Sequence, residues 1–161
     1  RQKGYTEAAI FASRHSYFAT SQRVQAFISS CERLGIETDE KYILKGSSTR
    51  NGGYEIGKQY AALKEPPKMI FCDSDAIALG ALRAFHEEGI SVPGDAELLS
   101  IGMLDPEAAS YYVPSLSVVE MPNKEIGQQV LRLMRKKVLN NDMSSEHVKV
   151  HAKLMLRESF S

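Results

Sequence analysis

The stretch KMIFCDSDAIALGALRAFHEEGISVPGDAELLSIGMLD runs from Lys68 to Asp105 and decides the fold. It begins with a short apolar run, KMIFC, followed by a polar turn and by AIALGALRAFHEE, in which apolar residues recur at helical spacing up to Gly89. A second apolar run, AELLSIG, leads to another acidic turn. A strand, a helix and a second strand in this order predict a βαβ unit with parallel strands.

The same alternation extends to both sides of this stretch. Apolar runs predict strands at EAAIFAS (7–13), KYIL (41–44), LSVVE (116–120) and HVKVHAKLMLRES (147–159), and helical spacing predicts helices from Thr20 or Ser21 to Gly35, over YEIGKQYAALK (54–64) and over NKEIGQQVLRLMRKKVL (123–139). Pro66 and Pro67 are expected to end the second of these helices. The sequence therefore predicts one α/β domain, an open parallel sheet with helices on both faces.

Composition excludes several classes of protein. Twenty basic and twenty acidic residues cancel in 161 residues, which gives no sign of a nucleic-acid-binding surface. No apolar run approaches the roughly 20 residues that span a bilayer, and no signal peptide is visible, so we expect a cytoplasmic protein without membrane contact. Cys31 and Cys72 are expected to be buried thiols in a reducing compartment. The first residue is Arg1, which suggests a piece of a longer chain.

Polar side chains follow the predicted strands. They stand at Arg14 to Tyr17 (including His15), at 46–48, at 73–75 and at 102–105. In an open α/β sheet, ligands bind beyond the carboxyl ends of the strands. Hydroxyls, carboxylates, a guanidinium and an aromatic ring at that edge are suited to a small polar molecule.

A catalytic interpretation of Asp73-Ser74-Asp75 has to be weighed against this one. An apolar strand that ends in Asp-x-Asp resembles the haloacid-dehalogenase phosphatases, in which Asp73 would be the nucleophile and Asp75 the acid. The family's Gly-Thr is replaced by Ala76-Ile77. Ser and Asp at a strand-to-helix junction are also common helix caps. The phosphate-loop, dinucleotide and metal-ligand motifs are missing, so we expect no enzyme, metal or cofactor.

An ordered series of motifs resembles the effector-binding domain of the LacI/GalR family of bacterial transcription regulators. The series comprises SQRVQAF near the start, ALGA after the polar turn, GISVPGD, IGMLD, PSLS and a closing LMLRES, and it covers nearly the whole chain. The resemblance implies a periplasmic-binding-protein-like subdomain and a ligand-sensing, non-catalytic function.

The resemblance also assigns residues to an effector site. Arg23 matches the family arginine that binds effector hydroxyls, while Ser74 and Leu104 occupy the positions of an effector-binding Asn and Asp. Asp73 adds an acid just before the Asn position, and Tyr17 lies on the loop that faces effector. The pocket is therefore expected to bind a sugar or another small polar ligand. The departures at these positions favour a ligand that is less hydroxylated than a sugar, or cationic. In this interpretation Asp75 is a helix cap.

The resemblance further implies the place of the chain in a larger protein. Residues 1–161 match the C-terminal part of the effector-binding domain, and the helix-turn-helix and the first part of the N-terminal subdomain are absent. The segment 123–146 resembles the piece that crosses to the N-terminal subdomain. Relatives dimerise through surfaces that here carry Leu79, Leu82 and Tyr112.

The expected function is thus the ligand-sensing domain of a homodimeric LacI-type repressor that contacts operator DNA only through its headpiece. A periplasmic-type sugar-binding protein, which shares the fold, and the phosphatase that uses Asp73 and Asp75 are the alternatives.

Overall fold

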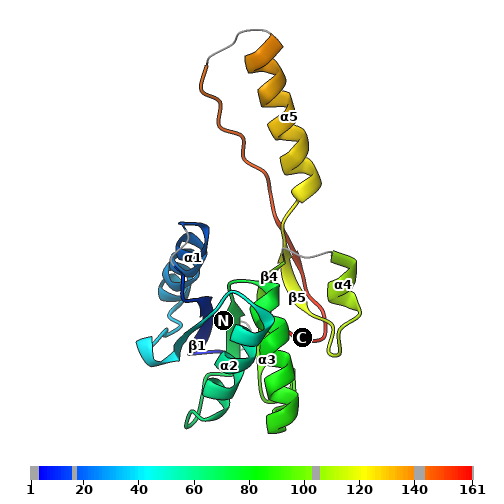
Figure 1. Cartoon of the computed structure of the whole chain (residues 1–161). Helices are drawn as coiled ribbons and strands as arrows, with labels where there is room; N and C mark the ends of the chain where they lie inside the picture. Colours follow the sequence, from blue (N-terminus) through cyan, green and yellow to red (C-terminus); the bar gives the residue numbers. More distant parts are fainter. Residues whose placement is uncertain (1–3, 16–17, 103–105, 140–143, 161) are drawn as a thin grey trace.

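The computed structural model describes residues 4–15, 18–102, 106–139 and 144–160. Six strands form one sheet in the order β2-β1-β3-β4-β5-β6 (Figure 1). Neighbouring strands are parallel from β2 to β5, and β6 pairs with β5 in the antiparallel direction. The predicted parallel sheet is confirmed except for this edge strand. The strands are β1 (Ala8–Ser13), β2 (Ile43–Gly46), β3 (Met69–Cys72), β4 (Glu97–Gly102), β5 (Ser117–Glu120) and β6 (Lys153–Met155).

Helices cover both faces of the sheet. Side chains alternate along β1, so Phe11 packs in the main core with the residues of α2 and α3, while Ile10 and Ala12 pack with Val24 and Phe27 of α1. Both cysteines are buried thiols, as predicted. The helices are α1 (Phe18–Leu34), α2 (Arg50–Ala61), α3 (Asp75–Glu88), α4 (Pro106–Ser110), α5 (Asn123–Leu139) and the short 3-10 helix η1 (Glu40–Tyr42).

Two helices end where their sequence signals predict, and two helices begin earlier than predicted. Gly35 and Gly89 end α1 and α3 with positive φ angles of 66° and 71°, which glycine adopts without a steric penalty. The predicted caps Thr20 and Ser21 are wrong, because α1 already begins at Phe18. Helix α2 begins at Arg50 after the cap Thr49, four residues before its predicted start.

Close contact between α2 and α3 explains the early start of α2. A Cβ atom on Gly53 would lie 2.1 Å from the carbonyl oxygen of Ile77, and one on Gly80 would lie 1.9 Å from that of Arg50. The glycines in RNGG read as a loop in the sequence, but here they let two helix backbones touch. Tertiary packing overrides the low helix propensity of glycine.

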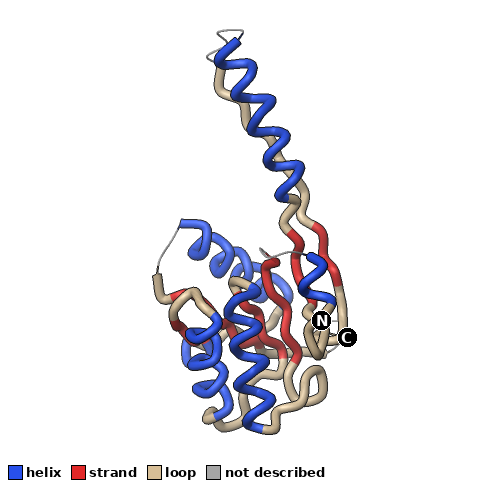
Figure 2. The backbone as a smooth tube through the Cα atoms, turned by 45° about the vertical axis from the view of Figure 1, so that its right-hand side comes forward, coloured by secondary structure: helices blue, strands red, loops and turns tan. Residues whose placement is uncertain are grey.

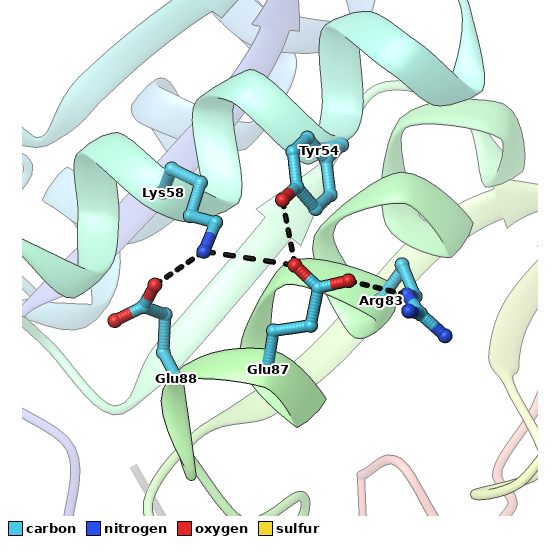
Figure 3. Close-up of polar contacts among 5 residues, drawn as sticks. All are labelled: Tyr54, Lys58, Arg83, Glu87 and Glu88. Carbon is cyan, nitrogen blue, oxygen red and sulfur yellow. Dashed lines mark hydrogen bonds and ion pairs between the residues drawn. The ribbon is translucent and has the colours of Figure 1, made fainter.

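Polar side chains also join these two helices on the solvent side (Figure 3). Tyr54 donates a hydrogen bond to Glu87 at 2.6 Å, and Arg83 pairs with the same carboxylate at 2.7 Å. Lys58 pairs with Glu88 and lies 3.6 Å from Glu87. The hydrogen bond from Tyr54 is the largest cause of a lowered pKa for Glu87.

Helix α5 stands away from the sheet (Figures 1 and 2). It has no buried residue, and the extended residues 144–152 run back beside it to β6. Glu146 on this returning segment pairs with Arg132 and Lys136 of the helix. The predicted helix 123–139 is confirmed in its full length. The predicted strand 147–159 is wrong in extent, since only three residues join the sheet.

The last described residues bind the opposite, amino-terminal end of the sheet. Ser159 is fully buried, and its hydroxyl donates to the carbonyl of Leu98 and accepts from the amide of Ser117, both at 2.8 Å. Its backbone carbonyl accepts from the amide of Leu98 at 2.7 Å. The C-terminal segment therefore fastens β4 to β5.

Candidate functional site

The candidate site lies at the carboxyl ends of β1 and β3, which are neighbours in the sheet. The two strands run in register, with Phe11 opposite Cys72, so the residues that follow lie side by side. The amide of Ser13 donates to Oδ2 of Asp73 at 2.8 Å. The amide of Asp73 in turn donates to the carbonyl of Phe11 at 3.0 Å. These bonds hold the acid against the end of the neighbouring strand.

Asp73 is a buried acid. Its relative exposure is 2%, and Oδ1 has no hydrogen-bond partner. Burial raises the pKa of Asp73 above its usual value, although hydrogen bonds from Ser13 and Ser74 and the positive charge of Arg23 act in the opposite direction. The site therefore contains one carboxylate oxygen with its hydrogen-bonding capacity unused.

Arg23 reaches the same point from α1. Its Nη1 donates to the backbone carbonyl of Asp73 at 3.3 Å, and the side chain is half-buried. The guanidinium has five N–H groups in a planar fork. The structure thus brings Arg23 and Asp73 together across 50 residues of sequence, as the sequence predicts for a ligand edge.

Ser74 serves both the site and the helix that follows. It has an extended backbone, and its hydroxyl accepts from the amide of Ile77, which makes it the N-cap of α3. The sequence allowed either Ser74 or Asp75 as the cap; Ser74 is the one observed, and Asp75 is the first residue of the helix itself. An acid in the first turn still interacts favourably with the helix dipole.

The remaining predicted site residues have different outcomes. The amide of His15 donates to the hydroxyl of Ser13 at 3.3 Å, and the His15 side chain is exposed. Tyr17 and Leu104 lie outside the described residues. Ser13, which binds Asp73, was missed by the sequence analysis. Its position as the last residue of a strand next to β3 is the signal that would have identified it.

This geometry is poorly suited to nucleophilic catalysis by Asp73. One carboxylate oxygen is held by a backbone amide and the other is inaccessible to solvent, so neither is free to attack phosphorus. Among the described residues, no three His, Cys, Asp or Glu side chains gather in a way that could hold a metal ion. The arrangement is suited to holding a polar molecule with hydrogen bonds.

A second surface gathers the residues expected at a dimer interface. Leu79, Leu82 and Tyr112 line one open cavity of about 500 Å³. Val113, which is 95% exposed, and three basic side chains, Arg50, Arg83 and His86, complete the lining. Leu79 and Leu82 also pack in part against the main core.

Within the described ranges, no helix has the length and apolarity needed to cross a membrane.

Comparison with known proteins bears on the candidate site and on the hollow beside α3. Residues 1–160 match the periplasmic binding protein-like domain family. The HTH-type transcriptional repressor PurR of Mannheimia succiniciproducens is 27% identical over 156 residues, which are 97% of this chain and 46% of that protein. The chain thus spans about half the length of the curated relatives it matches.

Solved structures agree with this match. A LacI family transcription regulator from Clostridium acetobutylicum is 30% identical, with a TM-score of 0.90 over 97% of this chain and 58% of that one. The transcriptional repressor ascG of Escherichia coli is 28% identical, with a TM-score of 0.83 over 99% of this chain and 57% of that one. The chain therefore belongs to the periplasmic binding protein-like domain family, in the form of the effector-binding domains of LacI/GalR regulators.

Proposed function

We propose that this chain senses a small polar effector for a LacI-type transcriptional repressor, and that binding of the effector alters the affinity of the repressor for operator DNA. The cluster formed by Arg23, Asp73 and Ser13 carries the proposal, because it places a half-buried guanidinium at the ligand edge of the sheet, directly beside a buried acid. A ligand that binds one of two conformations more tightly shifts the equilibrium between them. The protein is then a cytoplasmic regulator and not an enzyme.

The rest of such a repressor would lie outside the chain. Residues 1–161 would form the C-terminal part of the effector domain, and DNA contact would come from a headpiece, in line with the balanced charge. The segment 123–146 would cross to the N-terminal subdomain. Its helix supports this, since Val130, Met134 and Val138 are exposed on α5, and apolar patches of this kind mark interfaces.

The protein would act as a homodimer. Leu79, Leu82 and Tyr112 line one hollow on the flank of α3, and apolar side chains gathered in an open hollow are suited to association with a second copy, with the basic side chains at its rim. Truncating or charging this surface is then expected to change the oligomeric state.

The ligand class follows from what the site offers. The half-buried guanidinium of Arg23 can donate hydrogen bonds to a ligand, Asp73 adds an acidic group behind it, and Ser74 supplies a single hydroxyl. One similar structure, 23% identical, is a complex of the transcriptional regulator CelR with cellobiose. We infer a small polar ligand, less hydroxylated than a sugar or cationic.

A thermal-shift screen of the protein that contains this chain tests the proposal. Sugars, sugar phosphates, nucleobases and amines are compared, and a true ligand at a hundred times its Kd is expected to stabilise by ~2.7 kcal/mol. The ligand found must then change operator binding. Release of phosphate from a phosphomonoester, lost in Asp73→Asn, would instead support the phosphatase and overturn the proposal.

A further inference from the structure

A small cavity between α1 and the edge of the sheet has a composition that the proposed effector site does not explain. It encloses about 140 Å³ and is lined by Ala12, Ser13, Arg14, Thr20, Ser21, Val24, Gln25 and Lys45. Two of the eight residues are basic, none is acidic, and Arg23 and Asp73 are not among them. The cavity therefore adjoins the proposed effector site, with which it shares Ser13, but it is lined by a different set of charged side chains.

Strand geometry places the two basic side chains together. Ala12 is the register partner of Lys45, and Ala12 and Ile43 pack in the cluster beneath α1, so Lys45 points to that face as well. The amide of Arg14 donates to the carbonyl of Gly46 at 2.6 Å, which continues the strand pairing beyond β1. Arg14 thus follows Ala12 on the α1 face, beside Lys45.

These two cations have no counterion in the structure. Over the part of the chain that is described, no carboxylate pairs with Arg14 or Lys45. Like charges on neighbouring strands repel each other, and an anion between them removes that repulsion. Both side chains are exposed, so an ion can reach them from solvent.

The other wall of the cavity supplies hydrogen-bond donors. Thr20, Ser21 and Gln25 lie on the first turns of α1, and their hydroxyl and amide groups can donate to an anion. The N-terminal turn of a helix also favours negative charge. The volume of about 140 Å³ is large enough to hold a tetrahedral oxyanion.

We propose that the cavity formed by Arg14, Lys45, Thr20, Ser21 and Gln25 binds a tetrahedral oxyanion, either free inorganic phosphate or the phosphoryl group of a small metabolite. Guanidinium and ammonium groups that converge with hydroxyls provide the charge-assisted hydrogen bonds that phosphate oxygens accept. The proposal does not depend on the effector site.

Titration with inorganic phosphate at constant ionic strength tests it. The backbone amide signals of Thr20 to Gln25 are followed by NMR, with chloride replaced by phosphate. We expect saturable shifts whose apparent Kd weakens at least fivefold in Arg14→Gln and in Lys45→Gln. Lys149→Gln, an exposed lysine on the segment beside α5, is the matched control and is expected to leave the titration unchanged.

Two further variants sharpen the test. Ser21→Asp places a carboxylate in the cavity, so it is expected to raise Tm and to abolish the phosphate response. Arg23→Ala is expected to retain the response, which separates this site from the proposed effector site. Shifts that grow linearly without saturation, or that are the same in Arg14→Gln and Lys45→Gln as in the wild type, would overturn the proposal.

A parallel titration with glycerol phosphate identifies the source of the anion. Tighter binding of the ester than of inorganic phosphate assigns the cavity to the phosphoryl group of a metabolite. Binding of inorganic phosphate alone assigns it to the free ion.

Discussion

The amide of Ser13 and the carboxylate of Asp73 lie 2.8 Å apart, and this hydrogen bond joins the end of β1 to the end of β3. This hydrogen bond also fixes the orientation of the Asp73 carboxylate, because it occupies Oδ2 and leaves Oδ1 without a partner. A polar group that is buried without a partner destabilises the fold. Such a cost is commonly found at functional sites.

The burial of Asp73 should make the free energy of unfolding depend on pH. Burial raises the pKa of Asp73 in the folded state, so between the unfolded and folded pKa values the folded state binds more protons. The contribution of Asp73 is therefore largest below the unfolded pKa and is lost as the pH rises through the folded pKa. Asp73→Asn removes this term while keeping an oxygen acceptor for Ser13.

Urea unfolding of both proteins from about pH 2.5 to about pH 7 measures the effect, because the window must extend below the unfolded pKa of aspartate, about 3.9. The free energy of unfolding of the wild type minus that of Asp73→Asn should fall as pH rises. Asp39→Asn is the control, because hydrogen bonds from Lys41 lower the pKa of Asp39 and the corresponding difference should rise. Equal slopes for the two aspartates would contradict the assignment.

Arg23→Ala should weaken binding of the effector without unfolding the protein. Loss of a hydrogen bond from a charged group costs about 1.5–3 kcal/mol, which corresponds to a roughly tenfold to over hundredfold weaker Kd. Calorimetry with the ligand found in the screen measures it. Arg33, in the last turn of the same helix, donates a hydrogen bond to the hydroxyl of Ser30 at 3.1 Å, so Arg33→Ala should retain the affinity of the wild type. Equal affinity of the two variants would remove Arg23 from the site.

Glycine has a different role in α3 than in α5. In Gly80→Ala the new methyl group meets the backbone of α2, and the forced separation of the helices should cost about 1–3 kcal/mol of unfolding free energy. In Gly127→Ala no atom lies within 4 Å of the new Cβ, so α5 should gain about 0.5–1 kcal/mol of helix stability. Chemical denaturation measures the first and circular dichroism at fixed temperature the second. A neutral Gly80→Ala would show that α2 and α3 can separate without cost.

Val113→Glu should convert the proposed dimer to a monomer. The side chain is almost fully exposed in one chain, so the substitution affects folding little, but it places a charge in the hollow that contains Leu79, Leu82 and Tyr112. Sedimentation at micromolar concentration measures the change. Leu34→Glu, at the exposed end of α1, is the matched control and should sediment as the wild type does. A dimer that persists in Val113→Glu would place the interface elsewhere.

The elements that the sequence predicted best are those whose local signals agree with their surroundings. The helix Asn123–Leu139 was predicted to the residue, because its apolar spacing and its flanking residues mark both ends. The strands β1, β3 and β4 were predicted because each is an apolar run buried by helices. Arg23 and Asp73, which the resemblance assigned to one effector site, lie together at the carboxyl end of β3.

The misses have a common cause in long-range contacts. Gly53 belongs to a helix because α3 lies against it, and the sequence near it carries no sign of that neighbour. The last strand is short because residues 144–152 accompany α5 instead of the sheet. The bond between Ser13 and Asp73 joins residues 60 positions apart, and only the order of the strands reveals it.

Helix α3 begins one residue after Ser74 and ends at Glu88, which makes it about 20 Å long at 1.5 Å per residue. Its first turn is fixed to the candidate ligand site, and its flank carries Leu79 and Leu82 toward the hollow on the outer surface. The contacts of Gly53 and Gly80 bring the backbones of α2 and α3 into direct contact near the start of α3. A tilt of the peptide that joins β3 to α3 would therefore be transmitted along the rigid helix α3. The C-terminal end of the helix would then be displaced farther than its first turn.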